Sequence, residues 1–399
     1  MDANRNFQFP WPILRVVAHG MSILDVPRLE LNTMEEATNF VRAYGFEPNN
    51  EADSELLWNI FDDAIGFIEK SLKDAQYPKV PAHLRERESV TDLRRLLLLA
   101  SSPKPDPDRV WACAILRLMH VLIHLAHDPR MRAFDQVQQQ VLGRLDQHIF
   151  VDTTTGTTFL GSKESGNAIK LLFFKKKDRK DREREIIKLL HKAESTVEEI
   201  YDRIGFRLVT ETKLDAIRVI RLLMEKNIIC IPNIRPGRSR NRLVDLDRFE
   251  TEARKMDEVL KKSPSLSDGE LEKLVKRMER RISLRQLGRS FMNPHTSEYY
   301  RAIQFTCREL IKIRNPEFGI FSRLEPHLKN LPDGGRILAE VFPGLPPEFD
   351  HVFFPYEIQI MDVRAYADSI FGRSNHEEYR RKQLDTARSR VFGRLASAE

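Results

Sequence analysis

The chain has 399 residues, of which 41% are hydrophobic and 31% charged, a length and composition typical of two or three globular domains. Its net charge of +6 is small for this length and does not by itself indicate a nucleic-acid partner. The three cysteines occur singly, which fits neither a disulfide framework nor a zinc site. No apolar run reaches the ~20 residues that span a bilayer, and no signal-peptide pattern opens the chain. We therefore expect a cytoplasmic protein that does not bind membranes.

The first 150 residues carry apolar side chains at helical spacing. Met34 follows Asn32 and Thr33, a fair N-cap pair, and the pattern then recurs along this part of the chain. The expected helices are residues 34–44, 54–72, 90–99 and 110–127. The sequence thus predicts a helical domain over residues 1–150.

Residues 151–399 alternate between helical and strand patterns, which indicates an α+β domain with a mixed β-sheet flanked by helices. The segment SPSLSDGEL indicates a turn and an N-cap between two helices of a charged insertion near 248–290. A second insertion, rich in proline, is expected near 311–350. The expected helices are 181–200, 215–226 and 361–371, and the expected strands are 205–211, 228–234, 301–310 and 356–360.

Three segments of this second part carry a recognisable order of motifs. They read IYDRIGFRLVTE at 200–211, NPHTSEYYRAIQF at 293–305 and YEIQIMDVRAYADSIFGRSNHEEYRR at 356–381. The first contains Asp-x-x-Gly-x-Arg, and the third contains a Glu-Ile-Gln-Ile strand and His-x-x-Tyr-Arg. In this order they resemble the motifs of RelA/SpoT-type (p)ppGpp synthetases over about residues 165–385. Ala302 and Gln304 stand where that family usually has Ser and His.

The resemblance implies a nucleotidyltransferase-like fold over residues 151–399. It further implies Mg²⁺-dependent transfer of pyrophosphate from ATP to the 3′-hydroxyl of a guanosine or related purine nucleotide. Two alternatives stay open: the same chemistry directed at RNA, such as a tRNA end, and a nucleotide sensor that has lost turnover.

Two carboxylates are expected to hold the metal ion. Asp202 directly precedes the strand at 205–211, and Glu357 lies within the strand at 356–360. Mg²⁺ prefers one or two carboxylates together with water and phosphate oxygens. If the two strands are neighbours, both side chains can meet at one ion. The competing interpretations are a turn residue for Asp202 and an exposed strand position for Glu357.

Phosphate groups also require cations. Residues 170–192 contain ten Lys and Arg against four Asp and Glu, a net charge of +6, directly upstream of the Asp202 motif. The resemblance assigns ATP binding to this cluster, and we expect Lys175, Lys177 and Arg179 to contribute. Arg207 is expected to point into the same cleft as the metal. The alternatives are a salt-bridged helix face for the cluster and a structural ion pair for Arg207.

The remaining candidates are one aromatic residue and two clusters. Tyr300 is expected to stack on the acceptor base, unless it is a core tyrosine. Arginines at 235, 238, 240 and 242 would extend the nucleotide site or contact RNA, unless they form a solvated loop. His120 and His124 have the i,i+4 spacing of metal ligands, but we interpret them as core and capping residues of an amphipathic helix.

Overall fold

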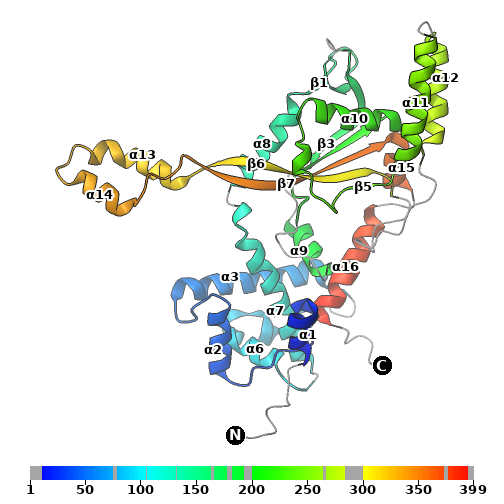
Figure 1. Cartoon of the computed structure of the whole chain (residues 1–399). Helices are drawn as coiled ribbons and strands as arrows, with labels where there is room; N and C mark the ends of the chain where they lie inside the picture. The colour runs from blue at the N-terminus through cyan, green and yellow to red at the C-terminus, as the bar shows by residue number, and fades with distance from the viewer. Residues whose placement is uncertain are drawn as a thin grey trace. The chain divides into compact units, whose positions relative to one another are not determined.

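The computed structural model describes residues 11–74, 79–104, 106–131, 133–162, 166–177, 182–192, 200–263, 267–283, 300–372 and 376–393. The chain forms two compact units (Figure 1). The helical unit comprises Met1–Pro129, Lys180–Ile200 and Glu377–Glu399. The sheet unit comprises Arg130–Arg179 and Tyr201–His376. The chain thus combines N-terminal helices with a seven-stranded mixed sheet, which confirms the expected α+β class.

The helical unit is a bundle whose helices begin at capping side chains. Thr33, Asn50 and Asp106 each accept a hydrogen bond from a backbone N–H of the first turn, as N-caps do. Its helices are α1 (Trp11–His19), α2 (Met34–Ala43), α3 (Glu51–Phe67, continued by a π-helical turn, Ile68–Leu72), α4 (Ala82–Arg85), α5 (Arg87–Val90), α6 (Arg94–Ala100), α7 (Pro107–Ala126), α9 (Arg182–His191) and most of α16 (His376–Phe392).

Two local features of this unit depart from a simple amphipathic bundle. The prediction of one helix over 90–99 is wrong: Thr91 has φ +58°, which ends α5, and the Asp92 side chain then accepts from the N–H of Arg94 at the start of α6. By length and composition α7 could cross a membrane. However, more than half of its most apolar stretch is buried inside the structure, as in a core helix.

The sheet has the strand order β1-β2-β3-β4-β7-β6-β5. Only the β4–β7 pair is parallel; the other neighbours are antiparallel. The strands are β1 (Ile149–Val151), β2 (Thr158–Leu160), β3 (Ile169–Lys177), β4 (Gly205–Thr210), β5 (Arg240–Asn241), β6 (Ile303–Arg314) and β7 (Phe349–Asp362). Buried side chains of α8 (Phe134–Asp146) and α10 (Lys213–Glu225) join those of the central strands in one core.

The central strands are buried on both faces: every residue of β4 except Arg207 is buried, as is every residue of β7 from Phe354 to Asp362. In β4, Phe206 and Leu208 are buried together with Ile358 of β7, whereas Arg207 between them is only partly buried. Helix α15 (Val363–Phe371) packs at the ends of β4 and β7, where Tyr366 stacks on Phe173 with ring centroids 4.9 Å apart. Nearly continuous burial of this kind is typical of central strands that are covered on both faces.

The strand expected at 228–234 is absent. That segment instead contains a 3₁₀ turn at Ile231–Asn233, and only Ile234 forms a β-bridge, to Cys307. Pro232 has no N–H and cannot donate to a ladder, which explains why the apolar run does not extend the sheet.

The two insertions are helical hairpins. The first consists of α11 (Leu246–Lys262) and α12 (Asp268–Arg281), and α12 begins at Ser267 in a capping box with Glu270, which confirms the predicted N-cap. The second consists of α13 (Pro316–Leu328) and α14 (Gly334–Val341). It lies at the end of a long antiparallel ribbon that β6 and β7 form beyond the other strands (Figure 1).

Candidate functional site

A row of charged and polar side chains crosses one face of the sheet. Registers align Lys177 with Gly205, Gly205 with Glu357, and Glu357 with Thr306. A second row lies two residues further along the strands. In order across the sheet it contains Lys175, Arg207, Gln359, Gln304 and Arg240, each aligned with the next. Because residues directly opposite each other and residues two apart share one face, these nine positions form a continuous strip.

Glu357 is the centre of a hydrogen-bond network in this strip. Its Oε1 accepts from Lys177 Nζ at 2.8 Å and from Gln359 Nε2 at 2.7 Å. Its Oε2 accepts from Gln304 Nε2. Gln359 is in turn oriented by Arg207, whose Nε and Nη2 donate to Gln359 Oε1 at 3.1 and 3.0 Å. The Glu357 side chain is 11% exposed, so its charge is satisfied by specific donors rather than by bulk water.

Lys177 is held in its charged form by two carboxylates. Burial by itself lowers the pKa of this ammonium, but the negative charges of Glu357 and Asp202 and the hydrogen bond to Glu357 outweigh burial and raise it. The Lys177 side chain keeps 25% of its surface exposed. The structure therefore brings three of the predicted site residues together, because Asp202 and Glu357 both lie near enough to the Lys177 ammonium to act on its charge.

Asp202 reaches this position because of the strand pairing that follows it. The N–H of Glu357 donates to the carbonyl of Ile204 at 3.0 Å, and the parallel pairing of β4 with β7 then begins at Gly205 opposite Glu357. A Cβ at Gly205 would lie 2.5 Å from the carbonyl oxygen of Glu357. The glycine of the Asp-x-x-Gly-x-Arg motif is thus required by the close approach of the two strands.

Two further predicted residues are Tyr300 and Arg179. Tyr300 is half-buried against the sheet core, six residues before Thr306, the partner of Glu357 in β6. At about 3.3 Å per residue it lies up to about 20 Å further along the strand direction. Arg179 lies outside the described residues.

Two of the predicted arginines form a group with Tyr201 beside the strip. The guanidinium carbons of Arg235 and Arg238 lie 4.3 and 4.9 Å from the ring centroid of Tyr201, the residue before Asp202. Such cation–π contacts hold the ring and keep two positive charges beside the start of β4. The arginine cluster was visible in the sequence, but its aromatic partner, 34 positions before Arg235, was not.

The roles of Gln304 and Gln359 were also missed. The alternation of the Glu-Ile-Gln-Ile strand already placed Gln359 on the side of Glu357. Gln304, in contrast, comes from β6 and reaches Glu357 only through the antiparallel register of β6 and β7. No local signal in the sequence marks it as a partner of Glu357.

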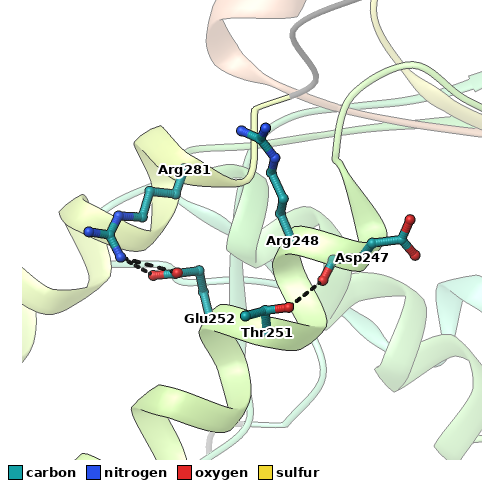
Figure 2. A pocket seen from close by; sticks show the side chains of 5 residues that line it. All are labelled: Asp247, Arg248, Thr251, Glu252 and Arg281. Atoms are coloured by element: carbon teal, nitrogen blue, oxygen red, sulfur yellow. Dashed lines mark hydrogen bonds and ion pairs between the residues drawn. The ribbon is translucent and has the colours of Figure 1, made fainter.

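A surface hollow of about 410 Å³ lies between α11 and α12 (Figure 2). It is lined by Asp247, Arg248, Thr251, Glu252 and Arg281. Arg281 pairs with Glu252 at 2.8 Å, and Thr251 donates to the carbonyl of Asp247 at 2.9 Å. None of the predicted site residues lines it. The Arg281–Glu252 pair links the two helices, whereas the Thr251 hydrogen bond lies within α11. The sheet strip, which holds the predicted residues, is therefore the candidate site.

The histidines of the helical unit have a structural environment. His120 Nδ1 lies 2.5 Å from the hydroxyl of Tyr44, and the His120 and His124 ring centroids are 4.5 Å apart. Burial, with a smaller contribution from His124, lowers the pKa of His120 to about 4. Within the described residues, no three His, Cys, Asp or Glu side chains form a group that could hold a metal ion.

The last residues of the third motif, from Glu377 on, belong with the rest of α16 to the helical unit. There Gln383 Nε2 donates to the Tyr379 hydroxyl at 2.9 Å and lies 3.1 Å from Nε2 of His191. The third motif is therefore divided between the units, with Glu357 in the sheet unit and Tyr379 in the helical unit.

Comparison of the chain with protein-family models and with curated proteins found no match.

Proposed function

We propose that the sheet unit is a divergent nucleotidyltransferase-type domain of the RelA/SpoT kind. It would transfer pyrophosphate from ATP to the 3′-hydroxyl of a purine nucleotide, with guanosine nucleotides as the first candidates. The observation that carries the proposal is the Lys177–Glu357 pair, with Asp202 acting on the same ammonium group. Asp202 and Glu357 belong to the motifs that resemble the family, Lys177 belongs to the basic segment upstream of them, and all three lie at one end of β4.

Whether a divalent cation fits this end of β4 can be judged from the Lys177 ammonium, the positive charge that already lies there. The Lys177 ammonium is stabilised by the charges of both Glu357 and Asp202, so this end of β4 attracts a cation. Two carboxylates are also the protein contribution that Mg²⁺ commonly takes, the rest being water and phosphate. Asp202 and Glu357 would therefore hold the ion. When bound, Mg²⁺ would neutralise phosphate charge during transfer.

The chain's own residues would bind the triphosphate and steer the acceptor. Lys175, Lys177 and Arg207 lie on one sheet face and present positive charge along it. In the reaction, the acceptor 3′-oxygen bonds to the β-phosphorus of ATP, the bond from that phosphorus to the α–β bridging oxygen breaks, and AMP leaves. The hydroxyl proton passes to Glu357 or to solvent. Binding and positioning by fixed charges account for most of the catalysis in such transfers.

One observation favours a second function, nucleotide binding without turnover. Both oxygens of Glu357 are already engaged, Oε1 by Lys177 and Gln359 and Oε2 by Gln304. Gln304 stands where the resembled family usually has His. A carboxylate held by three donors is a weaker metal ligand, and the strip would then bind ATP through its cations and leave it intact.

The test is incubation of the purified full chain with Mg²⁺ and ATP labelled in the γ-phosphate. Guanosine nucleotides, adenosine nucleotides and tRNA are offered in separate reactions, and products and AMP are separated by chromatography. Transfer of label to a purine nucleotide supports the enzyme, and label on tRNA redirects the same chemistry to RNA. ATP binding by calorimetry without AMP formation supports the sensor. Absence of ATP binding rules out both functions.

A matched pair of variants ties the activity to the strip. Glu357→Gln keeps the shape of the side chain, and its amide can still pair if the Gln304 amide turns to present its oxygen. Glu211→Gln makes the same chemical change just after β4 at an exposed carboxylate that pairs with Lys170 at 3.6 Å. We expect loss of transfer in the first variant and full activity in the second.

A further inference from the structure

The segment at the end of the β6–β7 ribbon, with its two helices, forms a projecting arm, defined here as residues 315–349. The ribbon stays paired as far as Arg314 and Phe349, and α13 and α14 follow at its end (Figure 1). The two helices contact each other, with Phe321 and Phe342 packed edge to face at 5.4 Å. The arm thus has a defined shape of its own.

The arm exposes apolar side chains that a lone chain would normally bury. No residue of α13 is buried, and in α14 only Gly334 is buried. Leu345 is 73% and Val341 59% exposed. The other exposed apolar residues of the tip are Ile320, Leu324, Leu331 and Ile337. A cluster of this kind at the end of a projecting element marks an interaction surface.

Charge indicates what covers this surface. Residues 315–349 contain five acidic residues (317, 325, 333, 340 and 348) and three basic ones (323, 329 and 336), a net charge of −2. Since the whole chain carries +6, the remaining residues carry +8. An acidic arm is attracted to the basic body of another copy and repelled by another acidic arm. Arm-to-body contact is therefore favoured over arm-to-arm contact.

The size of the arm is also adequate for such a contact. Residues 316–348 number 33, and a stable interface uses roughly 20–30 residues on each side. In a symmetric pair each copy has one arm and one body, so the same contact forms twice. We propose that this chain forms a homodimer in which the arm of each copy docks on the body of the other. The inference does not depend on the proposed enzymatic function.

The experiment compares three variants with the full chain by sedimentation velocity and light scattering across a concentration series. In the first, residues 315–348 are replaced by Asn-Gly, which closes the ribbon between Arg314 and Phe349 with a two-residue turn. The second is Val341→Asp with Leu345→Asp, two exposed positions where the change should not affect folding. The third, Leu246→Asp, is the control, an exposed leucine at the first position of α11 where an acidic residue suits the helix end.

We expect the full chain and the control to have twice the mass of one chain, and the arm-less chain to be a monomer with unchanged circular dichroism. The double variant should weaken the dimer by roughly tenfold to a hundredfold or more, as for loss of apolar anchors. Added salt should weaken the dimer as well. A full chain that is monomeric at every concentration would overturn the proposal, and the exposed surface of the arm would then be a binding site for a different protein. An arm-less dimer, or cross-links that join arm to arm, would overturn it too.

Discussion

Replacing Gly205 by alanine tests the link between strand pairing and the candidate site. The added Cβ would lie 2.5 Å from the carbonyl oxygen of Glu357 and 3.5 Å from its Cβ. The first distance is far inside van der Waals contact, and both strands are central in the sheet, so neither can move without disturbing a second neighbour. Forcing extra atoms into a packed core costs about 1–3 kcal/mol.

That cost should be visible in both stability and activity. For a unit of this size, about 1–3 kcal/mol lowers the melting temperature by roughly 2–12 °C. The clash also pushes β7 away at Glu357 itself, and a displacement of about 1 Å at a reacting group costs about a hundredfold in rate. Thermal unfolding followed by circular dichroism measures the first effect, and the labelled-ATP assay measures the second.

The matched control is Gly143→Ala in α8 of the same unit. Nothing lies within 4 Å of a Cβ built at Gly143, so alanine should raise stability there by about 0.5–1 kcal/mol through its better helix propensity. The two Gly→Ala changes are therefore expected to have opposite signs. If Gly205→Ala melted at or above the temperature of the parent, the close approach of β4 and β7 would not be what requires glycine in this motif.

Three further outcomes are expected. Glu357→Gln should lower pyrophosphate transfer by about a hundredfold to a thousandfold in the labelled-ATP assay, because it removes a fixed charge from the strip; a variant as active as the parent would leave Glu357 as a strand residue only. Burial lowers the pKa of His120 from its ordinary value of 6.5 to about 4, so the unfolded chain takes up this proton first as the pH falls. In urea titrations, the contribution of His120 to the free energy of unfolding should be complete above about pH 6.5 and fall by up to about 3 kcal/mol towards pH 4. His120→Leu should make the free energy of unfolding less dependent on pH in this range. Thr212 accepts from the N–H of Asp215 at 3.0 Å as the N-cap of α10, so Thr212→Ala should cost about 1 kcal/mol in the same titrations, and no change would show that the cap is dispensable.

The helices and their ends were largely predictable from local sequence. The cap at Ser267 is one of the local signals that can be read without knowing what the helix packs against. The failures were local as well. The break after Val90 depends on the left-handed conformation of Thr91. The apolar run around Pro232 has the composition of a strand, but Pro232 lacks the backbone N–H that would donate to a neighbouring strand.

The residues of the candidate site could be named from motifs, but their partners could not. The Asp-x-x-Gly-x-Arg and Glu-Ile-Gln-Ile segments identified Asp202, Arg207 and Glu357 as residues of interest. That Lys177 pairs with Glu357, 180 positions away, follows only from the order β3-β4-β7 and its registers. A shift of one residue in any of these pairs would turn a charged side chain into the core.

The sequence by itself therefore predicted helices α2, α3, α7, α10 and α15 and strands β4, β6 and β7, because caps and apolar periodicity act within a few residues. It also placed Glu357 and Gln359 on one side of their strand, because side chains alternate in a strand of any fold. The tertiary structure alone decided that four strands would align Lys177, Gly205, Glu357 and Thr306 in one row. It also decided that β6 and β7 would continue past their neighbours and carry α13 and α14 out of the core. Register and strand order arise from packing between segments far apart in the chain, and no local pattern records them.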